Sequence, residues 1–344
     1  MKLPEMKAPE PLTRLSFPTA DLMALTPPKF YDPNKQAVYA LACPDGTAHS
    51  GTLVYSRWAE MKLPAACPAQ APRCIAQAGR YDYAPSTDPA RIEWHVNFAD
   101  PNLFYAYAGS LMAQDETQVL EHPALGALRE ALVKRGEKAV TEDNTRPTPV
   151  LVMDVERRCA LALEPNAAAG RPDGLYGNKF ARATPADAVR ATRVLNPPTR
   201  TNVIAMAALS HGRGAYKVEE IEFTLATAYT AFYAAKLESA RAWAEAHAAP
   251  SVPGPQTVIH TGFWGCGAFG GDRELMALLQ LLAARLAGID ELDFHAFDEK
   301  GRATFEAARQ TLDALAPAGA ELPLSKLIQQ VVAHGFEWGY SDGN

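Results

Sequence analysis

The sequence predicts an α/β fold in which a mixed sheet lies between two layers of helices. Two observations lead to this prediction. Short apolar runs rich in β-branched and aromatic residues recur along the chain, as expected for buried strands. Segments with apolar residues at helical spacing separate these runs, and strands that alternate with helices form sheets covered on both faces.

From residue 91 onward the elements can be assigned in order. Strands are predicted at 91–98, 149–153, 201–207, 257–260 and 291–297. Helices are predicted at 114–122, 124–138, 185–195, 217–247, 273–286, 302–315 and 323–334. Segment 164–178 is rich in Ala, Gly and Pro, which predicts a long loop, and long loops in compact domains are often functional.

Residues 1–90 have a different composition. They are rich in Pro, Ala and short polar segments, with only brief strand-like runs at 37–42 and 52–55. No clear flexible linker separates them from the rest of the chain. We therefore expect 1–90 to form an accessory layer packed on a main domain that spans 91–344.

The stretch 257–286 combines a strand, a glycine-rich turn and a helix. Five glycines follow the strand, and Asp272 stands at the helix N-cap. Glycines let backbone N–H groups approach a ligand, and a helix N-terminus adds a partial positive charge, so this arrangement suits a diphosphate. The spacing matches neither the Rossmann fingerprint nor a Walker motif. On spacing alone, a phosphate-binding loop and a merely tight turn both remain open.

The residues of this turn resemble a known family. Gly262-Phe-Trp-Gly-Cys-Gly-Ala-Phe-Gly-Gly-Asp272 is similar to the diphosphate loop of poly(ADP-ribose) glycohydrolases, whose fold is an elaborated macrodomain, and the match includes the rare residues Trp264 and Cys266. Phe263 stands where the family has an asparagine. The resemblance implies a macrodomain-like fold and a ligand contact through Gly265, Cys266, Gly267, Ala268, Phe269, Gly270 and Gly271.

A second segment resembles the same family. Val96-Asn-Phe-Ala-Asp100 is similar to the family's Val-Asp-Phe-Ala-Asn, with the acid and the amide exchanged. Gln114-Asp-Glu116 falls where the family has Gln-Glu-Glu. The resemblance implies that Glu116 is the catalytic acid and base, with Asp115 beside it. It also makes ligand-binding candidates of Asn97, Asp100 and Gln114.

The chemistry of glycosidic cleavage suits such a pair. The oxocarbenium-like transition state requires a protonated leaving group and access for water. Adjacent side chains on a helix do not face each other, so one carboxylate can bind ribose hydroxyls while the other acts as acid and base. Glu116 needs a raised pKa, which burial and the diphosphate charge would supply. The alternative is an Asp-Glu pair that only stabilises the first helical turn.

Three further positions decide how far the resemblance extends. The family's glycine triplet falls on Phe104-Tyr-Ala106, so the loop is either remodelled around a different ligand or no longer supports catalysis. Tyr176 is the candidate to cover the ligand, and Phe297 the candidate to stack on adenine. The alternative for Tyr176 is an ordinary surface tyrosine, and for the polar residues at the end of strand 91–98 it is a turn.

Composition limits the partners. The net charge of −6 argues against general nucleic-acid binding and against binding to anionic membranes. The five cysteines form no CxxC pair and have no zinc-spaced partners, so we expect reduced thiols, no metal site and no cofactor. His260 and His295 lie on buried-strand patterns and are expected to be satisfied core residues. No signal-peptide pattern begins the sequence, which predicts a cytoplasmic protein.

Two classes of function follow from the residues and the resemblance. The first, which we expect, is a hydrolase that removes ADP-ribose from a polymer, a protein side chain or a nucleobase, with Glu116 as acid and base. The second is a non-catalytic module that binds ADP-ribose or a related nucleotide. A different nucleotide in a remodelled pocket is a third possibility.

Overall fold

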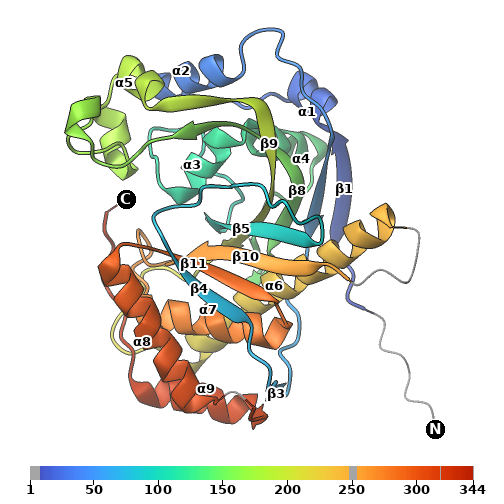
Figure 1. Ribbon diagram of the computed structural model, residues 1–344, viewed down its shortest axis with the longest axis vertical. Helices are drawn as coiled ribbons and strands as arrows, with labels where there is room; N and C mark the ends of the chain where they lie inside the picture. The colour runs from blue at the N-terminus through green and yellow to red at the C-terminus, as the bar shows by residue number, and fades with distance from the viewer. Residues whose placement is uncertain (1–7, 248–253, 318, 344) are drawn as a thin grey trace.

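The computed structural model describes residues 8–247, 254–317 and 319–343. Its central feature is a mixed sheet of eight strands (Figure 1). The strand order is β1 (Thr13–Pro18), β2 (Thr52–Arg57), β8 (Val150–Leu161), β9 (Thr192–Ala207), β5 (Arg91–Ala99), β10 (Gln256–Gly262), β11 (Glu291–Phe297) and β4 (Arg73–Ala78). Two short pairs complete the described strands, β3 (Ala66–Cys67) with β12 (Leu322–Pro323), and β6 (Glu142–Asp143) with β7 (Arg146–Pro147).

Strand direction divides the sheet into two halves. From β9 through β5, β10 and β11 to β4, neighbouring strands are parallel. From β1 through β2 and β8 to β9, they are antiparallel. In the parallel half, the carboxyl ends of β5, β10 and β11 therefore meet at one edge, where ligand sites of open α/β sheets are usually found.

Helices cover both faces of the sheet, as the sequence predicts. One layer consists of α6 (Val218–Ala246), α7 (Arg273–Ala287), α8 (Glu299–Leu315) and α9 (Leu324–His334). The other face carries α1 (Thr19–Leu25), α2 (Pro33–Ala42), α3 (Gln114–Glu121), α4 (Pro123–Arg135) and α5 (Pro185–Arg190). Figure 1 shows α7, α8 and α9 on one side of the strands and α2, α3 and α4 on the other. The short 3₁₀ helices are η1 (Ala167–Ala169) and η2 (Gly177–Arg182).

Each side of the sheet has its own apolar core. Trp94 and Val96 of β5 pack with α6 and α7, whereas Val203 and Ala205 of β9 pack with α3 and α4. This alternation of apolar side chains to the two faces is what a doubly covered strand requires. The predicted three-layer α/β architecture is confirmed.

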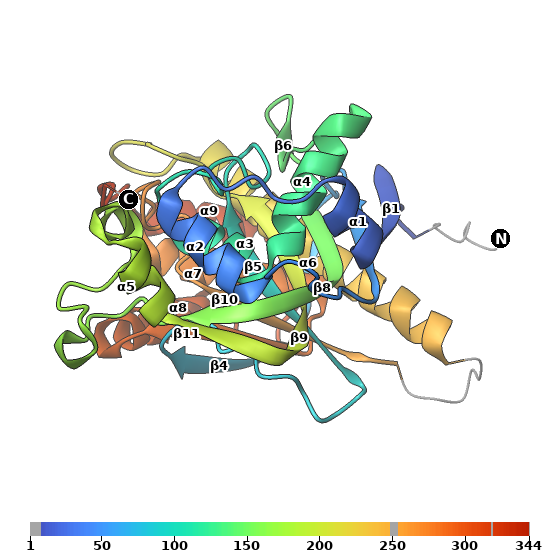
Figure 2. The same cartoon turned by 90° about the horizontal axis from the view of Figure 1, so that it is seen from above.

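Residues 1–90 are built into this sheet. Strands β1 and β2 form one edge, and β4 forms the other (Figure 2). The same view shows β8 and β9 side by side, with α5 near the end at which β8 finishes and β9 begins. The division into an accessory region and a main domain at residue 90 stays a prediction, but the sheet itself takes strands from both sides of that boundary.

Two predicted elements differ from the structure. Residues 37–42, read as strand-like, belong to α2, whose N-cap Asp32 accepts hydrogen bonds from Asn34 N and Lys35 N and whose first residue is Pro33. An Asp-Pro pair is a helix-start signal, and it overrides the strand preference of Val38 and Tyr39. The helix predicted at 185–195 ends at Arg190, and β9 begins at Thr192 and continues through Pro197 and Pro198 because it pairs with β8 on either side of them.

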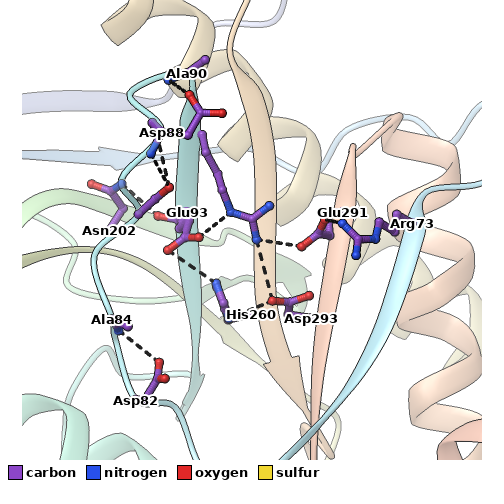
Figure 3. A network of polar contacts seen from close by, with 12 residues as sticks. Arg73, Asp82, Ala84, Asp88, Ala90, Glu93, Asn202, His260, Glu291 and Asp293 are labelled. Atoms are coloured by element: carbon purple, nitrogen blue, oxygen red, sulfur yellow. Dashed lines mark hydrogen bonds and ion pairs between the residues drawn. The ribbon is translucent and has the colours of Figure 1, made fainter.

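One face of the parallel half is polar rather than apolar. Arg91 lies between two acids, with its guanidinium 2.6 Å from a Glu93 oxygen and 2.7 Å from a Glu291 oxygen (Figure 3). His260 lies 3.8 Å from both Glu93 and Asp293. Segment 79–90 crosses this face as a strap, with the Tyr81 hydroxyl donating to Val96 O at 3.1 Å and the Tyr81 ring in contact with His95 and His295.

Candidate active site

A cavity of about 820 Å³ lies at the carboxyl ends of the parallel strands. Asp100 follows β5, Gly262 ends β10 and Phe297 ends β11, and all three line the cavity. The N-terminal half of α3, the loop between β10 and α7 and the strap 79–83 form its other walls. A volume of this size suits a nucleotide-sized ligand.

The glycine-rich loop folds back on itself between β10 and α7. Gly265 adopts a positive φ of 75°, and a Cβ there would lie 2.6 Å from Ala208 Cβ, so only glycine fits. Gly271 N donates to Gly265 O at 2.9 Å and Gly270 N to Gly267 O at 3.1 Å, which closes the turn. Asp272 caps α7 as predicted, accepting from Leu275 N at 2.8 Å.

This fold leaves part of the loop facing the cavity. Residues 265–269 line the cavity, whereas Gly270 and Gly271 do not. In the described part of the chain, the N–H groups of 267–269 donate to no backbone carbonyl, so they are available for other acceptors. Arg273, the first residue of α7, also lines the cavity and lies with its guanidinium 5.1 Å from the Phe263 ring. The loop can therefore offer both backbone donors and a cation to an anion.

The C-terminal segment packs on the other side of the same loop. A Cβ at Gly270 would lie 3.2 Å from Ser341 N, and one at Gly267 would lie 3.2 Å from Asp342 Oδ2. Asp342 N donates to Gly267 O at 3.4 Å, and Asp342 itself lines the cavity. The close approach that Gly270 permits is therefore to the protein's own backbone at 339–341, not to the cavity.

The two candidate catalytic carboxylates lie in the first turn of α3. Both line the cavity, and their residues are only 6% (Asp115) and 4% (Glu116) exposed. Glu116 Oε2 accepts from Ala113 N at 3.0 Å, which fixes the side chain across the helix start. Asp115 Oδ1 accepts from Asn97 Nδ2 at 3.0 Å.

Burial dominates the ionisation of this pair. It raises the pKa of Asp115, and the neighbouring Glu116 charge raises it further, against the hydrogen bond from Asn97. Burial also raises the pKa of Glu116, against backbone hydrogen bonds and the charge of Lys35. A carboxyl that keeps its proton near neutral pH is what a general acid requires.

The polar residues at the end of β5 take different places. Asn97 lies beneath the cavity wall and reaches only Asp115 among the candidate site residues. Gln114 lines the cavity while its amide spans the β5 backbone, accepting from Phe98 N at 2.7 Å and donating to Val96 O at 3.0 Å. Asp100 Oδ1 accepts from Asn102 N at 2.8 Å, as in a turn, and also faces the cavity.

The aromatic residues that replace the family's glycines leave the cavity free. Phe104 is fully buried in the core, and Tyr105 is 65% exposed and lies over Arg129. Of the three residues, Ala106 lines the cavity. Phe104 has a positive φ of 52°, a conformation that glycine adopts without strain. The departure from the family pattern is thus accommodated behind the cavity wall.

Tyr176, predicted to cover the ligand, and Phe297, predicted to stack on adenine, share a partner that the sequence did not suggest. The Arg80 guanidinium lies 4.2 Å from the Tyr176 ring centroid and 5.5 Å from that of Phe297. All three residues line the cavity, and Phe297 is 49% exposed. Arg80 also donates to Glu164 Oε1 at 2.8 Å. An arginine between two rings can stack on a base or bind an anion that enters there.

Histidines and tyrosines form the floor beside these residues. Tyr81 contacts His295 with ring centroids 4.8 Å apart, and His95 stacks on His260 at 4.3 Å. His295 lines the cavity, and burial lowers its pKa to about 4. His260 Nδ1 lies 3.3 Å from His295 Nε2 and His260 Nε2 lies 3.8 Å from a Glu93 oxygen, whereas among the described residues His260 Nε2 and His295 Nδ1 make no hydrogen bond, so these two histidines are satisfied in part.

The remaining expectations can be compared with the described part of the chain. Burial raises the pKa of the Cys266 thiol, which fits a packing residue better than a nucleophile. Within residues 8–247, 254–317 and 319–343, no group of three or more His, Cys, Asp or Glu side chains is placed to hold a metal ion. In the same ranges no helix is both long and apolar enough to cross a bilayer.

A protein-family model matches residues 174–304 of the chain. The matching model is described as poly(ADP-ribose) glycohydrolase, macro domain fold. The predicted family resemblance is confirmed for this region. The matched region contains Tyr176, the whole glycine-rich loop and Phe297. It begins after Asp115 and Glu116, so it does not include them.

Solved structures of poly(ADP-ribose) glycohydrolases are also similar to the chain. The enzyme from Thermomonospora curvata is 15% identical, with 84% of this chain and 96% of that chain covered at a TM-score of 0.45. The same enzyme bound to the inhibitor ADP-HPD is 15% identical, with 84% of this chain and 96% of that chain covered at a TM-score of 0.46. The enzyme from Deinococcus radiodurans in complex with ADP-ribose is 12% identical, with 91% and 99% covered and a TM-score of 0.37.

Several cavity residues were not identified from the sequence. They come from segments distant from both motifs: Arg80, Tyr81, Tyr83, Arg157, Arg193 and Asp342. None stands in a pattern that marks a ligand site, because strap and tail residues reach the cavity only through the tertiary fold. Arg273 is the exception, since its place at the first position of a helix after a glycine-rich loop is a signal for anion binding that sequence reasoning could have used.

Proposed function

We propose that this protein is a hydrolase that releases ADP-ribose from an ADP-ribosylated substrate, with Glu116 as acid and base. One observation carries the proposal. The buried carboxylates of α3 and the open N–H groups of the glycine-rich loop face the same cavity, although about 150 residues of sequence lie between them. The family match over 174–304 supports a diphosphate at the loop, and the loop faces the carboxylates.

The proposed reaction uses two walls of the cavity, the glycine-rich loop and the start of α3. Loop N–H groups and Arg273 bind the diphosphate, which orients the distal ribose toward α3. Glu116 gives its proton to the leaving atom as the bond from the anomeric carbon breaks, and the negative charge held by the Asp115–Glu116 pair stabilises the positive charge on the ribose. Water then adds to the anomeric carbon, and its proton passes to the Glu116 carboxylate. The products are ADP-ribose and the free acceptor.

The carrier of the ADP-ribose is proposed only as a class, namely a polymer, a protein side chain or a nucleobase. The half-exposed Phe297 and Arg80 offer a stacking site for the adenine at the far side of the cavity. We also propose a cytoplasmic location, and an accessory role for residues 1–90 in holding the cavity wall that contains Arg80.

The test pairs calorimetric binding of ADP-ribose with hydrolysis assays on several ADP-ribosylated substrates. Glu116→Gln keeps the size of the side chain and its acceptor for Ala113 N, but it cannot donate the proton. We expect ADP-ribose binding by wild type and variant, and a loss of turnover of about 10²-fold or more in the variant. Glu219→Gln, an exposed change in the first turn of α6, is the matched control.

Each other outcome has a definite meaning. Binding without turnover by the wild type on every substrate would favour a non-catalytic ADP-ribose-binding module. Equal turnover by Glu116→Gln and wild type would remove Glu116 from its role. If neither protein binds ADP-ribose, the cavity serves another ligand and the proposed function fails.

A further inference from the structure

A lysine is buried behind the catalytic wall. Lys35 lies in the first turn of α2 and has no exposed surface. Asp32 caps this helix by accepting from Lys35 N at 3.0 Å, and Tyr31 N and Asp32 N both donate to Ala108 O, so the helix start is fixed to the loop that leads into α3. The side chain thus points into the protein from a firmly held backbone.

The ammonium group has few partners for a buried cation. Within the described residues, its one hydrogen bond goes from Nζ to Tyr107 O at 2.9 Å, although an ammonium has three donors. Burial lowers the pKa of Lys35 to about 8, against the charges of Glu116, Asp32 and Asp115. A lysine without a functional reason is rarely buried this deeply, because removing the charge from water is costly.

The carboxylate pair needs a cation of this kind. Glu116 and Asp115 are both buried and adjacent, so each disfavours ionisation of the other. Without a positive charge nearby, both would tend to keep their protons. Hydrolysis by the proposed route needs one carboxylic acid and one carboxylate at the same time.

We propose that Lys35 is a positioning residue whose buried ammonium keeps one member of the Asp115–Glu116 pair ionised while the other retains its proton. The inference rests on the proposed function and adds to it the device that sets the charge of the site. Lys35 acts on the pair from α2, which contacts α3, and it does not touch the substrate, because it lines no part of the cavity.

Several other charged groups lie on the elements that pack near Lys35 and the pair. On α5, which packs against α2, Asp187 pairs with Arg190. On α4, Glu130 pairs with Lys29 at 2.6 Å and accepts from the Tyr107 hydroxyl at 3.0 Å. Asp100, which follows β5, acts on both carboxylates in the sense that raises their pKa values, opposite to Lys35. Lys35 is therefore the cation that offsets the charges of Asp32, Asp115 and Glu116.

The experiment measures kcat/KM against pH from 4.5 to 9.5 in four variants and the wild type. Lys35→Met removes charge and hydrogen bond, Lys35→Gln removes the charge but keeps a donor for Tyr107 O, and Lys35→Arg keeps the charge. Lys29→Met, which removes an exposed lysine just before α2, is the matched control. Thermal unfolding of each variant verifies that it is folded.

We expect the acid limb of the profile to move to higher pH by about one unit in Lys35→Met and Lys35→Gln, because the pair then holds both protons longer. Above about pH 8, where Lys35 itself loses its proton, the difference from wild type should vanish. Lys35→Arg and Lys29→Met should follow the wild type. If Lys35→Met does not fold, the pH profile of Lys35→Gln alone tests the proposal.

The proposal is overturned if the neutral variants keep the wild-type profile, or if Lys35→Arg shifts as they do. If the wild type turns over no substrate, the proposed function fails, and Lys35 is tested by the free energy of unfolding against pH. A change in that dependence in Lys35→Gln but not in Lys29→Met would still support the charge coupling. Superimposable curves would overturn it.

Discussion

Asp115 and Glu116 are placed where ionisation is unfavourable, and this has a consequence for stability. A carboxyl whose pKa is higher in the folded than in the unfolded protein binds more protons when folded. The free energy of unfolding then falls as pH rises from the unfolded pKa, near 4, toward the raised folded value. The stability that the raised pKa values contribute is fully present below the unfolded pKa and is lost as pH rises through the folded pKa. The site thus lowers stability at the pH at which it would work.

Neutral replacements should reverse this loss. We expect Asp115→Asn and Glu116→Gln to raise the free energy of unfolding at pH 8 by about 1 kcal/mol or more, since one unit of pKa shift corresponds to about 1.4 kcal/mol. The gain should be smaller at pH 5, because less of the stability contributed by the raised pKa values has been lost at that pH. Urea unfolding at the two pH values measures it.

Glu121→Gln is the informative comparison on the same helix. Burial raises the pKa of Glu121 as well, but its carboxylate is paired with Arg157 at 2.8 Å. Breaking a buried ion pair leaves a buried charge, so this variant should lose stability at pH 8. A loss of stability in Asp115→Asn and Glu116→Gln at pH 8 would contradict the account of the pair given above.

The loop before α3 shows how an element can keep a backbone shape while its side chains change. Phe104 holds a positive φ that costs about 1–3 kcal/mol for a non-glycine residue. Its ring is fully buried in the core formed with α3 and α4, and that burial offsets the strain. The next residue, Tyr105, contributes little because it is exposed.

This division predicts unequal effects of two neighbouring substitutions. Phe104→Ala should lower the free energy of unfolding by about 3–5 kcal/mol, because it leaves a cavity in the core. Tyr105→Ala should change it by less than about 1 kcal/mol and leave ADP-ribose binding unaltered, since its ring lies over Arg129 outside the cavity. Urea unfolding and calorimetry measure the two quantities. A large loss of binding in Tyr105→Ala would place the tyrosine in the site.

Local signals explain which elements were predictable. The unit β10–loop–α7 was predicted nearly to the residue because glycines, the Asp272 cap and the apolar spacing of the helix all lie within it. Helix α2 was missed although its start signal, Asp32-Pro33, is equally local. By contrast, Arg80 and Asp342 line the cavity from the strap and the C-terminal segment, which have no periodic pattern. Lys35 acts on the carboxylate pair from about 80 residues earlier in the sequence. Local pattern cannot indicate which long-range contacts a strap will make.

At the scale of the whole molecule, the site is assembled from nearly every part of the chain. Lys35 and Arg80 come from the first 90 residues, Glu116 from the middle, and Asp342 from the C-terminal segment. The sheet is built in the same way, because its antiparallel edge and its β4 edge come from residues before 91. The prediction of a separable main domain at 91–344 can therefore be tested directly.

A protein consisting of residues 91–344 should not fold cooperatively. It lacks β1, β2 and β4, so β8 and β11 would become unpaired edges, and both apolar cores would lose side chains such as Tyr55 and Trp58 that are almost fully buried. Open edges with exposed apolar surface favour aggregation. We expect no cooperative thermal transition and no ADP-ribose binding, whereas residues 8–344 should keep both. Co-expression with residues 1–90 should restore folding if the lost strands are the cause. A cooperative transition in 91–344 alone would instead establish the division at residue 90 and make the N-terminal strands dispensable.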